Sequence, residues 1–335
     1  MSDNSPALLD ALVERGVSRR QFLKFCGAVA AVLALSSTEV ETIAKALSTS
    51  PRLPIIWLEF QDCTGDSESF LRAARQPNPL ASGATLPGIS ELVLDILSVD
   101  YHETLMVSAG ASADKSRADT LQQYNGRYIC VVEGSIPTGQ GGAYCTIGGR
   151  SAVDIVRQVA AGAKATIALG TCASDGGLAA AFPNPTGATG VLNAVPGLQN
   201  LIKLPGCPAN AVNLVATIVY VITYGRLPSL TGSGRPEFAY GEEVHEHCPR
   251  KEHYEEERFV LAWGDEGHRR GWCLRKMGCR GPDTDHNCPT VRWVEGTSWP
   301  VAAGHGCIGC SEANFWDRMT PFYASQSGDD DAHDD

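Results

Sequence analysis

The stretch "LPIIWLEFQDCTGDSESF", residues 53–70, decides the fold of this chain of 335 residues. Its first eight residues are apolar except for one glutamate, a pattern typical of a strand that is buried on both faces of a parallel sheet. A polar loop follows at once and contains Cys63 and, a little later, Asp66. The stretch therefore predicts a buried strand whose carboxyl end presents a thiol and a carboxylate.

Similar apolar runs recur downstream and alternate with helical patterns as far as about residue 226. Further strands are predicted at 104–110, 128–134, 165–170 and 201–206, and helices at 89–98, 151–161 and 209–225. Such alternation predicts an α/β domain with a parallel sheet covered on both faces, in the flavodoxin-like style. Ligands of these sheets bind beyond the carboxyl ends of the strands.

Three cysteines lie just beyond predicted strands. Cys63, Cys172 and Cys207 each follow one of them, close to a glycine. Because the carboxyl ends of parallel strands meet at one edge of a sheet, we expect these thiols to converge in space. One such cysteine would be an ordinary buried thiol, but three in the same topological position favour a metal site.

A second group of cysteines follows the boundary segment "GSGRPEFAYGEE" (232–243). Seven of the twelve cysteines fall between Cys207 and Cys310. The segment beyond the boundary has little regular apolar periodicity, so it needs metals or disulfides to hold it together. Its candidate ligands, in chain order, are His245, Cys248, Cys273, Cys279, Cys288, Cys307 and Cys310.

Three kinds of chemistry suit these ligands. Structural zinc commonly uses C-x2-C pairs and histidine, but two closed four-ligand zinc sites need one ligand more than this segment offers. Seven ligands divide into four and three, which suits one 4Fe–4S and one 3Fe–4S cluster. Disulfides are the third possibility, although they are rare in proteins that fold in the cytoplasm.

The N-terminal segment carries a twin arginine. "SRRQFLKFCGAVAAVLALSS" (18–37) places Arg19 and Arg20 before an uncharged run at 25–38, and "AKA" (44–46) offers a small-x-small cleavage site. The uncharged run has 14 residues, whereas a membrane-spanning helix needs roughly 20. The pattern resembles a Tat export signal. The alternative is an amphipathic N-terminal helix with two surface arginines.

The charge of the chain argues against one class of partner. A net charge of −11 disfavours nucleic acid, because phosphate binding needs clustered lysine and arginine. Part of this charge lies in the tail "SGDDDAHDD" (327–335), which is predicted to be disordered. The apolar stretch 211–225 is too short to span a membrane and is predicted to be a buried helix.

Seven motifs occur in a characteristic order: "WLEFQDCTG", "VVEGSIPTGQGGAYCTIGG", "GTCAS", "PGCPAN", "VHEHCPR", "GWCLRKMGCRGPDT" and "GHGCIGCSE". Together they resemble the small subunit of nickel–iron hydrogenases over about residues 51–320, with the Tat-like leader in front. The resemblance implies a leader segment at 1–50, a flavodoxin-like domain at 51–230, a Cys/His-rich, mostly irregular iron–sulfur domain at 231–322 and an acidic disordered tail at 323–335.

The resemblance also implies three clusters. The ligands of the proximal 4Fe–4S cluster would be Cys63, Asp66, Cys172 and Cys207. Those of the distal 4Fe–4S cluster would be His245, Cys248, Cys273 and Cys279, the H-x2-C spacing selecting His245 over His247. Those of the medial 3Fe–4S cluster would be Cys288, Cys307 and Cys310, because Pro300 stands where a fourth cysteine makes a cubane in some relatives. Cys26, Cys130 and Cys145 receive no cluster.

Asp66 departs from the family pattern, which is usually C-T-G-C-S-E at this point. It occupies the slot of the fourth proximal ligand, and carboxylates do bind iron. Some oxygen-tolerant relatives carry extra cysteines in this loop and after the "GTC" motif, but here Gly65 and Gly177 stand in those places. The chain instead resembles the high-affinity, oxygen-insensitive hydrogenases first noted in actinobacteria, which share this aspartate. The alternatives are a solvated loop residue and an N-cap of the following helix.

The function implied by the resemblance is electron transfer within a hydrogen-oxidising uptake hydrogenase. The nickel–iron site would belong to a large partner subunit, since the single C-x2-C pair of this chain is Cys307/Cys310. Further expected partners are a second copy of the heterodimer and a redox acceptor protein or quinone pathway. The expected location is at the membrane, either exported or held by a retained leader at the cytoplasmic face. Two other readings remain: a flavodoxin-like iron–sulfur subunit of another redox complex, and a zinc-stabilised interaction protein without redox function.

Overall fold

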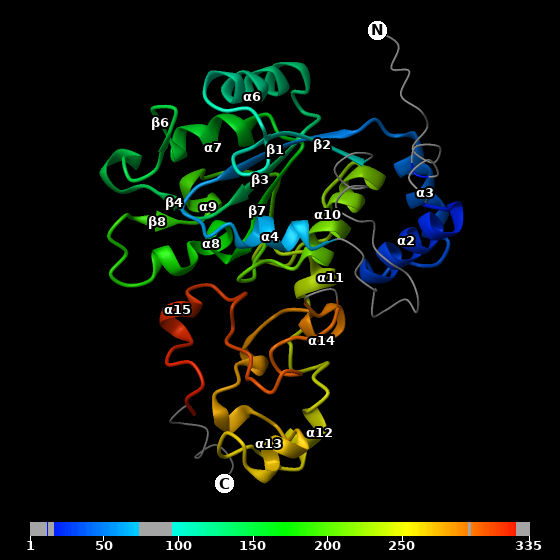
Figure 1. The fold of residues 1–335 in the computed structure, drawn as a ribbon, viewed down its shortest axis with the longest axis vertical. Helices are drawn as coiled ribbons and strands as arrows, with labels where there is room; N and C mark the ends of the chain where they lie inside the picture. The colour runs from blue at the N-terminus through cyan, green and yellow to red at the C-terminus, as the bar shows by residue number, and fades with distance from the viewer. Residues whose placement is uncertain (1–11, 13–16, 74–95, 294–295, 326–335) are drawn as a thin grey trace.

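The computed structural model describes residue 12 and residues 17–73, 96–293 and 296–325. Its centre is a five-stranded parallel sheet with the strand order β2-β1-β3-β7-β9 (Figure 1). The strands are β1 (Leu53–Glu59), β2 (Leu97–His102), β3 (Ile129–Glu133), β7 (Ala165–Leu169) and β9 (Leu201–Leu204). In chain order the five strands are arranged 2-1-3-4-5, which is the flavodoxin-like order, so the predicted α/β sheet domain is confirmed.

Both faces of the sheet are covered, because side chains alternate between the faces along each strand. In β1, Ile55 and Trp57 join one apolar core and Ile56 joins the other. The first core includes α10 (Ala211–Tyr224) and the second includes α7 (Ala152–Ala161) (Figure 1). Both helices lie where the apolar periodicity of the sequence predicts them.

Further helices follow the strands of the sheet domain, and the loops that matter for the site lie beside them. These helices are α4 (Gly65–Leu71), α6 (Ala111–Gln123), α8 (Gly170–Asp175) and α9 (Val191–Ala194), of which α8 begins directly at the end of β7. Two small antiparallel pairs complete the domain, β4 (Ile136–Pro137) with β8 (Ala188–Thr189) and β5 (Thr146–Ile147) with β6 (Arg150–Ser151).

The strand predicted at 104–110 is wrong. The strand lies earlier, in β2, and the predicted residues form a turn and loop in which Val107 is fully exposed. β2 is an edge strand paired with β1 alone, so it tolerates polar residues such as Asp100 and lacks the continuous apolar run of a central strand. Most of the helix predicted at 89–98 lies outside the described residues, and its last two residues belong to β2.

The N-terminal segment is helical and joins the first core. Helices α2 (Arg19–Val32) and α3 (Glu39–Thr49) contact each other and α10, and Figure 1 shows them in blue beside it. Cys26 and Ile43 are fully buried there. Across the described part of the chain, no helix has both the length and the apolar character needed to cross a membrane.

Beyond residue 231 the described chain is mostly irregular, as predicted, and it forms the lower part of the molecule in Figure 1. Its helices are α11 (Glu237–Tyr240), α12 (Lys251–Glu255), α13 (Glu266–Arg270), α14 (Cys288–Val291) and α15 (Phe315–Arg318). Its apolar core has six buried side chains, against which Cys248, Cys279, Cys288 and Cys307 pack. So small a core needs an additional source of stability. The predicted tail at 327–335 lies outside the described residues.

Candidate metal centres

Three loops at the carboxyl ends of β1, β7 and β9 carry the thiols expected to converge. Cys63 follows β1, Cys172 lies in the first turn of α8 after β7, and Cys207 follows β9. Burial raises the pKa of Cys172 to about 11 and that of Cys207 to about 12, and the negative charges of Asp66 and Cys63 add to both shifts. These four groups therefore lie within electrostatic reach of one another at one edge of the sheet.

Two glycines lie directly against these thiols. A Cβ atom on Gly65 would lie 3.0 Å from the Cys63 sulfur, and one on Gly177 would lie 2.5 Å from the Cys172 sulfur. Gly177 also has a φ of +55°, which side chains disfavour. A side chain at Gly177 would also overlap the backbone of Cys172, so this position has no room for a cysteine in the present arrangement, whereas a side chain at Gly65 would require only a small shift of the Cys63 thiol.

Asp66 is buried in the first turn of α4, with 8% of its surface exposed. Its Oδ1 accepts a hydrogen bond from the backbone N–H of Ala209 at 2.6 Å, and a Cβ on Gly170 would overlap its Oδ2 at 2.1 Å. Burial, and then the charge of Glu133, raise the pKa of Asp66 to about 8. The two alternatives, a solvated loop residue and a helix N-cap, are therefore wrong. Asp66 is buried, and the N-cap of α4 is Thr64, which makes no side-chain capping bond.

Glu133, at the end of β3, is a site residue that the sequence does not reveal. Its carboxylate accepts hydrogen bonds from the N–H groups of Asp66 at 3.0 Å and Ser67 at 3.2 Å, and from the indole of Trp57 at 3.0 Å. The Ser67 hydroxyl donates to it as well, at 2.5 Å. Glu133 therefore fixes the start of α4, and with it the position of Asp66. A glutamate at the end of a fully buried strand is the sequence signal that points to such a role.

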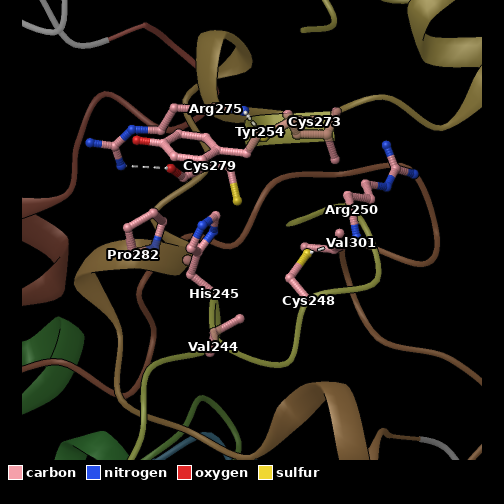
Figure 2. Close-up of a pocket in the computed structure, with 12 residues that line it drawn as sticks. Val244, His245, Cys248, Arg250, Tyr254, Cys273, Arg275, Cys279, Pro282 and Val301 are labelled. Atoms are coloured by element: carbon pink, nitrogen blue, oxygen red, sulfur yellow. Dashed lines mark hydrogen bonds between the residues drawn. The ribbon is translucent and has the colours of Figure 1, made fainter. Parts of the chain in front are cut away.

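The candidate distal ligands line one cavity. Figure 2 shows His245, Cys248, Cys273 and Cys279 around it, with Arg250 and Arg275 at its rim. Three thiols and one imidazole are ligands that suit either a zinc ion or an iron–sulfur cluster.

The two histidines of this region lie in different surroundings. His245 lines the cavity with its ring edge-on to Tyr254, and burial, followed by the charge of Lys251, lowers its pKa. A neutral imidazole is the form that binds a metal. His247 is exposed and forms an ion pair with Glu242. Geometry thus places His245, rather than His247, among the cysteines.

Backbone N–H groups point at the thiols in a recurring pattern. Cys248, Cys273 and Cys307 each accept a hydrogen bond at 3.4 Å from the N–H two residues further along the chain. Cys279 accepts one from the N–H of Cys307 at 3.3 Å. Hydrogen bonds to sulfur stabilise the thiolate, and in iron–sulfur proteins they tune the cluster.

The candidate medial ligands converge as well. Burial, and then the charges of Cys310 and Cys307, raise the pKa of Cys288. Cys288 also accepts a hydrogen bond from the indole of Trp293 at 3.4 Å. Pro300 is exposed, and its carbonyl accepts the N–H of His305 at 2.9 Å. The three cysteines form a third thiol group between the other two.

Hydrogen bonds connect the three groups in series. The carbonyl of Cys310 accepts a hydrogen bond from the hydroxyl of Thr171, which directly precedes Cys172, at 2.5 Å, and this bond links the medial to the proximal group. Cys307 donates its N–H to Cys279, which links the medial to the distal group. The result is a continuous series of candidate sites from the edge of the sheet into the C-terminal region.

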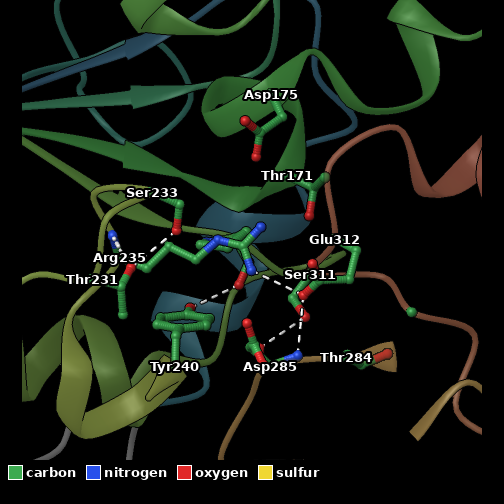
Figure 3. Close-up of polar contacts among 12 residues, drawn as sticks. Thr171, Asp175, Thr231, Ser233, Arg235, Tyr240, Thr284, Asp285, Ser311 and Glu312 are labelled. Atoms are coloured by element: carbon green, nitrogen blue, oxygen red, sulfur yellow. Dashed lines mark hydrogen bonds and ion pairs between the residues drawn. The ribbon is translucent and has the colours of Figure 1, made fainter. Parts of the chain in front are cut away.

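A buried ion pair fixes the junction between the two regions. Arg235 and Glu312 are 2.9 Å apart, and the same carboxylate oxygen accepts the N–H of Asp285 at 3.1 Å. Figure 3 shows this pair below Thr171 of the sheet domain, with Ser311 beside it. Both charges are almost fully buried, so their mutual pairing is required.

The remaining cysteines lie apart from these groups. Cys26 and Cys130 are fully buried in apolar cores, and burial raises the pKa of each, to about 12 for Cys26. Cys145 packs at the edge of the second core. All twelve cysteines are free thiols, so the disulfide reading receives no support.

Family models match both regions of the chain. Residues 63–221 match the NADH ubiquinone oxidoreductase 20 kDa subunit, and residues 240–323 match the C-terminal domain of the NiFe/NiFeSe hydrogenase small subunit. The boundary between the two matches falls within the segment where the sheet domain gives way to the irregular region.

Curated relatives are similar over most of their length. The uptake hydrogenase small subunit of Afipia carboxidovorans is 45% identical, over 92% of this chain and 81% of the relative. The hydrogenase-2 small chain of Escherichia coli is 44% identical, over 89% of this chain and 77% of the relative.

Solved structures show the same architecture. A NiFeSe hydrogenase of Desulfomicrobium baculatum superposes with a TM-score of 0.74 at 32% identity, over 82% of this chain and 100% of that chain. An actinobacterial-type NiFe hydrogenase from Ralstonia eutropha superposes with a TM-score of 0.69 at 26% identity, over 84% of each chain. The chain belongs to the family of nickel–iron hydrogenase small subunits.

Proposed function

We propose that this chain is the electron-transferring small subunit of a nickel–iron uptake hydrogenase and relays electrons through three iron–sulfur clusters. The observation that supports this most is the connection of three thiol groups in series. Within a hydrogenase complex, such a series connects the large subunit, where hydrogen is oxidised, with an acceptor. Iron–sulfur clusters bound there would carry electrons one at a time.

The proposed ligands follow the three groups. Cys63, Asp66, Cys172 and Cys207 would hold a proximal 4Fe–4S cluster. His245, Cys248, Cys273 and Cys279 would hold a distal 4Fe–4S cluster, and Cys288, Cys307 and Cys310 a medial 3Fe–4S cluster. Buried thiols with raised pKa values bind metal only after they lose their protons, so iron binding and deprotonation are coupled at these sites.

The protein's own groups prepare the sites for this task. N–H donors directed at Cys248, Cys273, Cys279 and Cys307 offset the charge that the thiolates carry. Burial keeps water away from the medial thiols, and the 2.6 Å bond from Ala209 orients the Asp66 carboxylate. A carboxylate in place of a fourth thiolate supports the proposal of an oxygen-insensitive enzyme of the actinobacterial type.

The finer assembly is also a proposal. The large subunit would pair with this chain and hold nickel and iron, and two such heterodimers would associate. A redox acceptor protein or a quinone pathway would take electrons at the distal end. The complex would lie at the membrane, directed there by a Tat-type leader. N-terminal sequencing of the native protein tests the leader: a start near residue 47 supports export with cleavage, and an intact N-terminus supports retention at the cytoplasmic face.

Metal analysis of the native heterodimer tests the proposed cofactors. We expect iron and acid-labile sulfide in the ratio of two 4Fe–4S clusters and one 3Fe–4S cluster, with the EPR signal of the latter in the oxidised protein. A colourless protein with stoichiometric zinc would support the zinc-stabilised alternative instead. Native complexes that contain the clusters but no nickel subunit would support another redox complex.

Substitutions at Asp66 test the unusual ligand. Asp66→Cys should keep a proximal 4Fe–4S cluster with a changed EPR spectrum and potential, because a soft thiolate replaces a hard carboxylate. Asp66→Ala should lose the proximal cluster or convert it to one with less iron. Asp62→Ala, which removes a nearby exposed carboxylate, is the matched control and should leave the spectrum unchanged. An unaltered proximal cluster in Asp66→Ala would contradict ligation.

A further inference from the structure

Thr171 lies where the loops of two different candidate sites meet. It is 1% exposed and directly precedes Cys172. Its backbone N–H donates to the carbonyl of Gly206 at 2.9 Å, and its hydroxyl oxygen accepts the N–H of Gly206 at 2.9 Å. Gly206 directly precedes Cys207. Thr171 therefore ties together the loops that carry two of the proximal thiols.

The same hydroxyl reaches the medial group. Its proton is donated to the carbonyl oxygen of Cys310 at 2.5 Å, so both the donor and an acceptor site of the hydroxyl are used. Figure 3 shows Thr171 beside the segment that carries Ser311 and Glu312. One buried side chain thus joins the loops of Cys172, Cys207 and Cys310.

Neighbouring contacts support this role. The backbone N–H of Cys207 bonds to the thiol of Cys310, and the hydroxyl of Tyr240 donates to the carbonyl of Pro205 at 2.8 Å. The Arg235–Glu312 pair holds the other side of the Cys310 segment. The segment is therefore held from several directions, and Thr171 is its side-chain bond to the loop of Cys172.

We infer that Thr171 is a positioning residue for electron transfer between the proximal and medial sites. The inference rests on the proposed ligand sets. Its hydroxyl fixes Cys310 against α8 and supplies a hydrogen-bonded route from the residue beside Cys172 to a medial ligand. The transfer moves one electron and no proton: the proximal site is oxidised as it gives up one electron, and the medial site is reduced as it takes up that electron. Because tunnelling rates fall steeply with separation, a small displacement of the Cys310 loop slows this step.

The test compares three variants of the native heterodimer. Thr171→Val keeps the shape but removes the hydroxyl, and Thr171→Ser keeps the hydroxyl. Ser174→Ala is the matched control, because it removes a buried hydroxyl from the same helix. The Ser174 hydroxyl donates to the carbonyl of Ala168, within the sheet domain. The readouts are hydrogen–deuterium exchange activity, which needs no electron relay, the rate of medial-site reduction after hydrogen is added, and the EPR signal of the medial cluster.

We expect Thr171→Val to slow medial reduction by roughly tenfold and to change the medial EPR signal, with isotope exchange retained. Thr171→Ser and Ser174→Ala should both stay close to the wild type. Equal medial reduction rates in Thr171→Val and the wild type would overturn the inference. If the wild type itself lacks a medial 3Fe–4S signal, the ligand assignment fails instead, so the two failures are distinguishable.

A second readout covers a variant that assembles poorly. If Thr171→Val is recovered with less iron, Thr171→Ala removes the hydroxyl without adding a methyl group to a packed site. Iron loss in valine and alanine variants, with full iron in the serine variant, supports the role of the hydroxyl. Equal iron loss in the serine and valine variants contradicts it.

A separate observation concerns the N-terminal helices. The apolar face of α2, which includes Phe22, Phe25 and Val29, lies in the same core as α10. The hydroxyl of Tyr224, at the end of α10, donates to Glu39 at the start of α3 at 2.6 Å. The "AKA" segment at 44–46 lies within α3. The apolar run and the cleavage segment of the leader are therefore both folded against the sheet domain.

We propose that residues 18–49 form an N-terminal cap whose docking on α10 prevents processing of the leader. Peptidases bind their substrates as extended chain, and a cleavage segment inside a packed helix is not extended. An apolar run buried in a protein core cannot enter a membrane at the same time. Cleavage or export therefore requires the cap to be released first.

Limited digestion with trypsin at Lys45 tests the cap in the native heterodimer. Phe25→Ser removes a side chain that is 3% exposed, and Leu23→Ser removes an apolar side chain of the same helix that is 39% exposed. We expect cleavage after Lys45 to be roughly tenfold faster in Phe25→Ser, and unchanged in Leu23→Ser. Equal cleavage rates in both variants and the wild type would contradict docking. If Phe25→Ser is insoluble, Tyr224→Phe, which leaves the leader unaltered, should speed cleavage to a smaller extent, and an unchanged rate there is equally contradictory.

Discussion

The two regions of the described chain are held together in different ways. The sheet domain buries apolar side chains on both faces of five parallel strands, with two large cores. The C-terminal region has a core of its own with only six buried side chains, against which cysteines pack. So small a core favours an additional source of stability, and we expect metal binding by the thiols to supply it.

This difference explains the arrangement of the candidate sites. The proximal group sits on rigid elements, at the ends of β1, β7 and β9, where the sheet positions each loop. The medial and distal groups sit on mostly irregular chain, with a small apolar core beside them. The Arg235–Glu312 pair and the Thr171 hydroxyl connect the two regions.

Removal of iron should have the largest effect and should affect the two regions differently. Chelation, or expression without iron, should unfold the C-terminal region and leave the sheet domain intact. The reason is that the free energy of metal binding is needed for folding only in the C-terminal region. Hydrogen exchange followed by mass spectrometry measures this. Amides of residues 240–320 should lose their protection while those of β3 and β7 keep it. Uniform loss or uniform retention would show that the two regions do not differ in this way.

The second largest effect should come from breaking the ion pair at the junction of the two regions. Arg235→Met leaves Glu312 as an unpaired buried charge, which costs about 3–5 kcal/mol of unfolding free energy. Denaturant unfolding of the loaded heterodimer measures the cost. In the double variant with Glu312→Met the charge is gone, so most of the stability should return. A double variant as unstable as the single one would mean that the loss comes from packing and not from charge.

A core substitution tests whether the sheet domain can be weakened without an effect on the C-terminal region. Ile167→Ala in β7 removes a fully buried side chain and should cost about 2–5 kcal/mol. The loss should fall on the sheet domain, so the EPR signals of the medial and distal clusters should stay as they are. Changes in those signals would reveal that the core of the sheet also supports the irregular region.

Surface charge should matter least. Lys251 and Glu246 form an exposed ion pair at 2.8 Å, next to the candidate distal site. Lys251→Gln should leave the denaturant midpoint of unfolding almost unchanged, because exposed pairs contribute little to stability. The same denaturant titration serves as the check, and a larger loss would indicate that this pair supports the distal ligands.

The strongest signals of the sequence were the runs buried on both faces. Strands β1, β3 and β7 are central, and almost all of their residues are buried, so the apolar pattern finds them. The edge strand β9 is also found, because three of its four residues are buried. The other edge strand, β2, has three half-buried residues and mixed polarity, and an apolar run in the following loop resembles a strand more closely than β2 does.

Some features of the candidate site could be predicted from the sequence, and others depend on contacts between distant residues. Cysteines at strand ends and H-x2-C spacing are visible in the sequence, so the thiol groups could be predicted. Glu133 and Thr171 act through backbone groups of residues distant in the chain, so the local sequence does not show which residues they contact. The docking of α2 on α10 depends on tertiary packing that the amphipathic pattern of either helix leaves open.

The most direct test of the proposed electron relay is an EPR-monitored redox titration of the native heterodimer, with its iron and sulfide content measured on the same sample. We predict three separate iron–sulfur signals: one from an oxidised 3Fe–4S cluster and two from reduced 4Fe–4S clusters. The signals should show magnetic interaction between neighbouring sites, since the thiol groups are connected in series. A single cluster, signals without interaction, or zinc in place of iron would contradict the proposed relay.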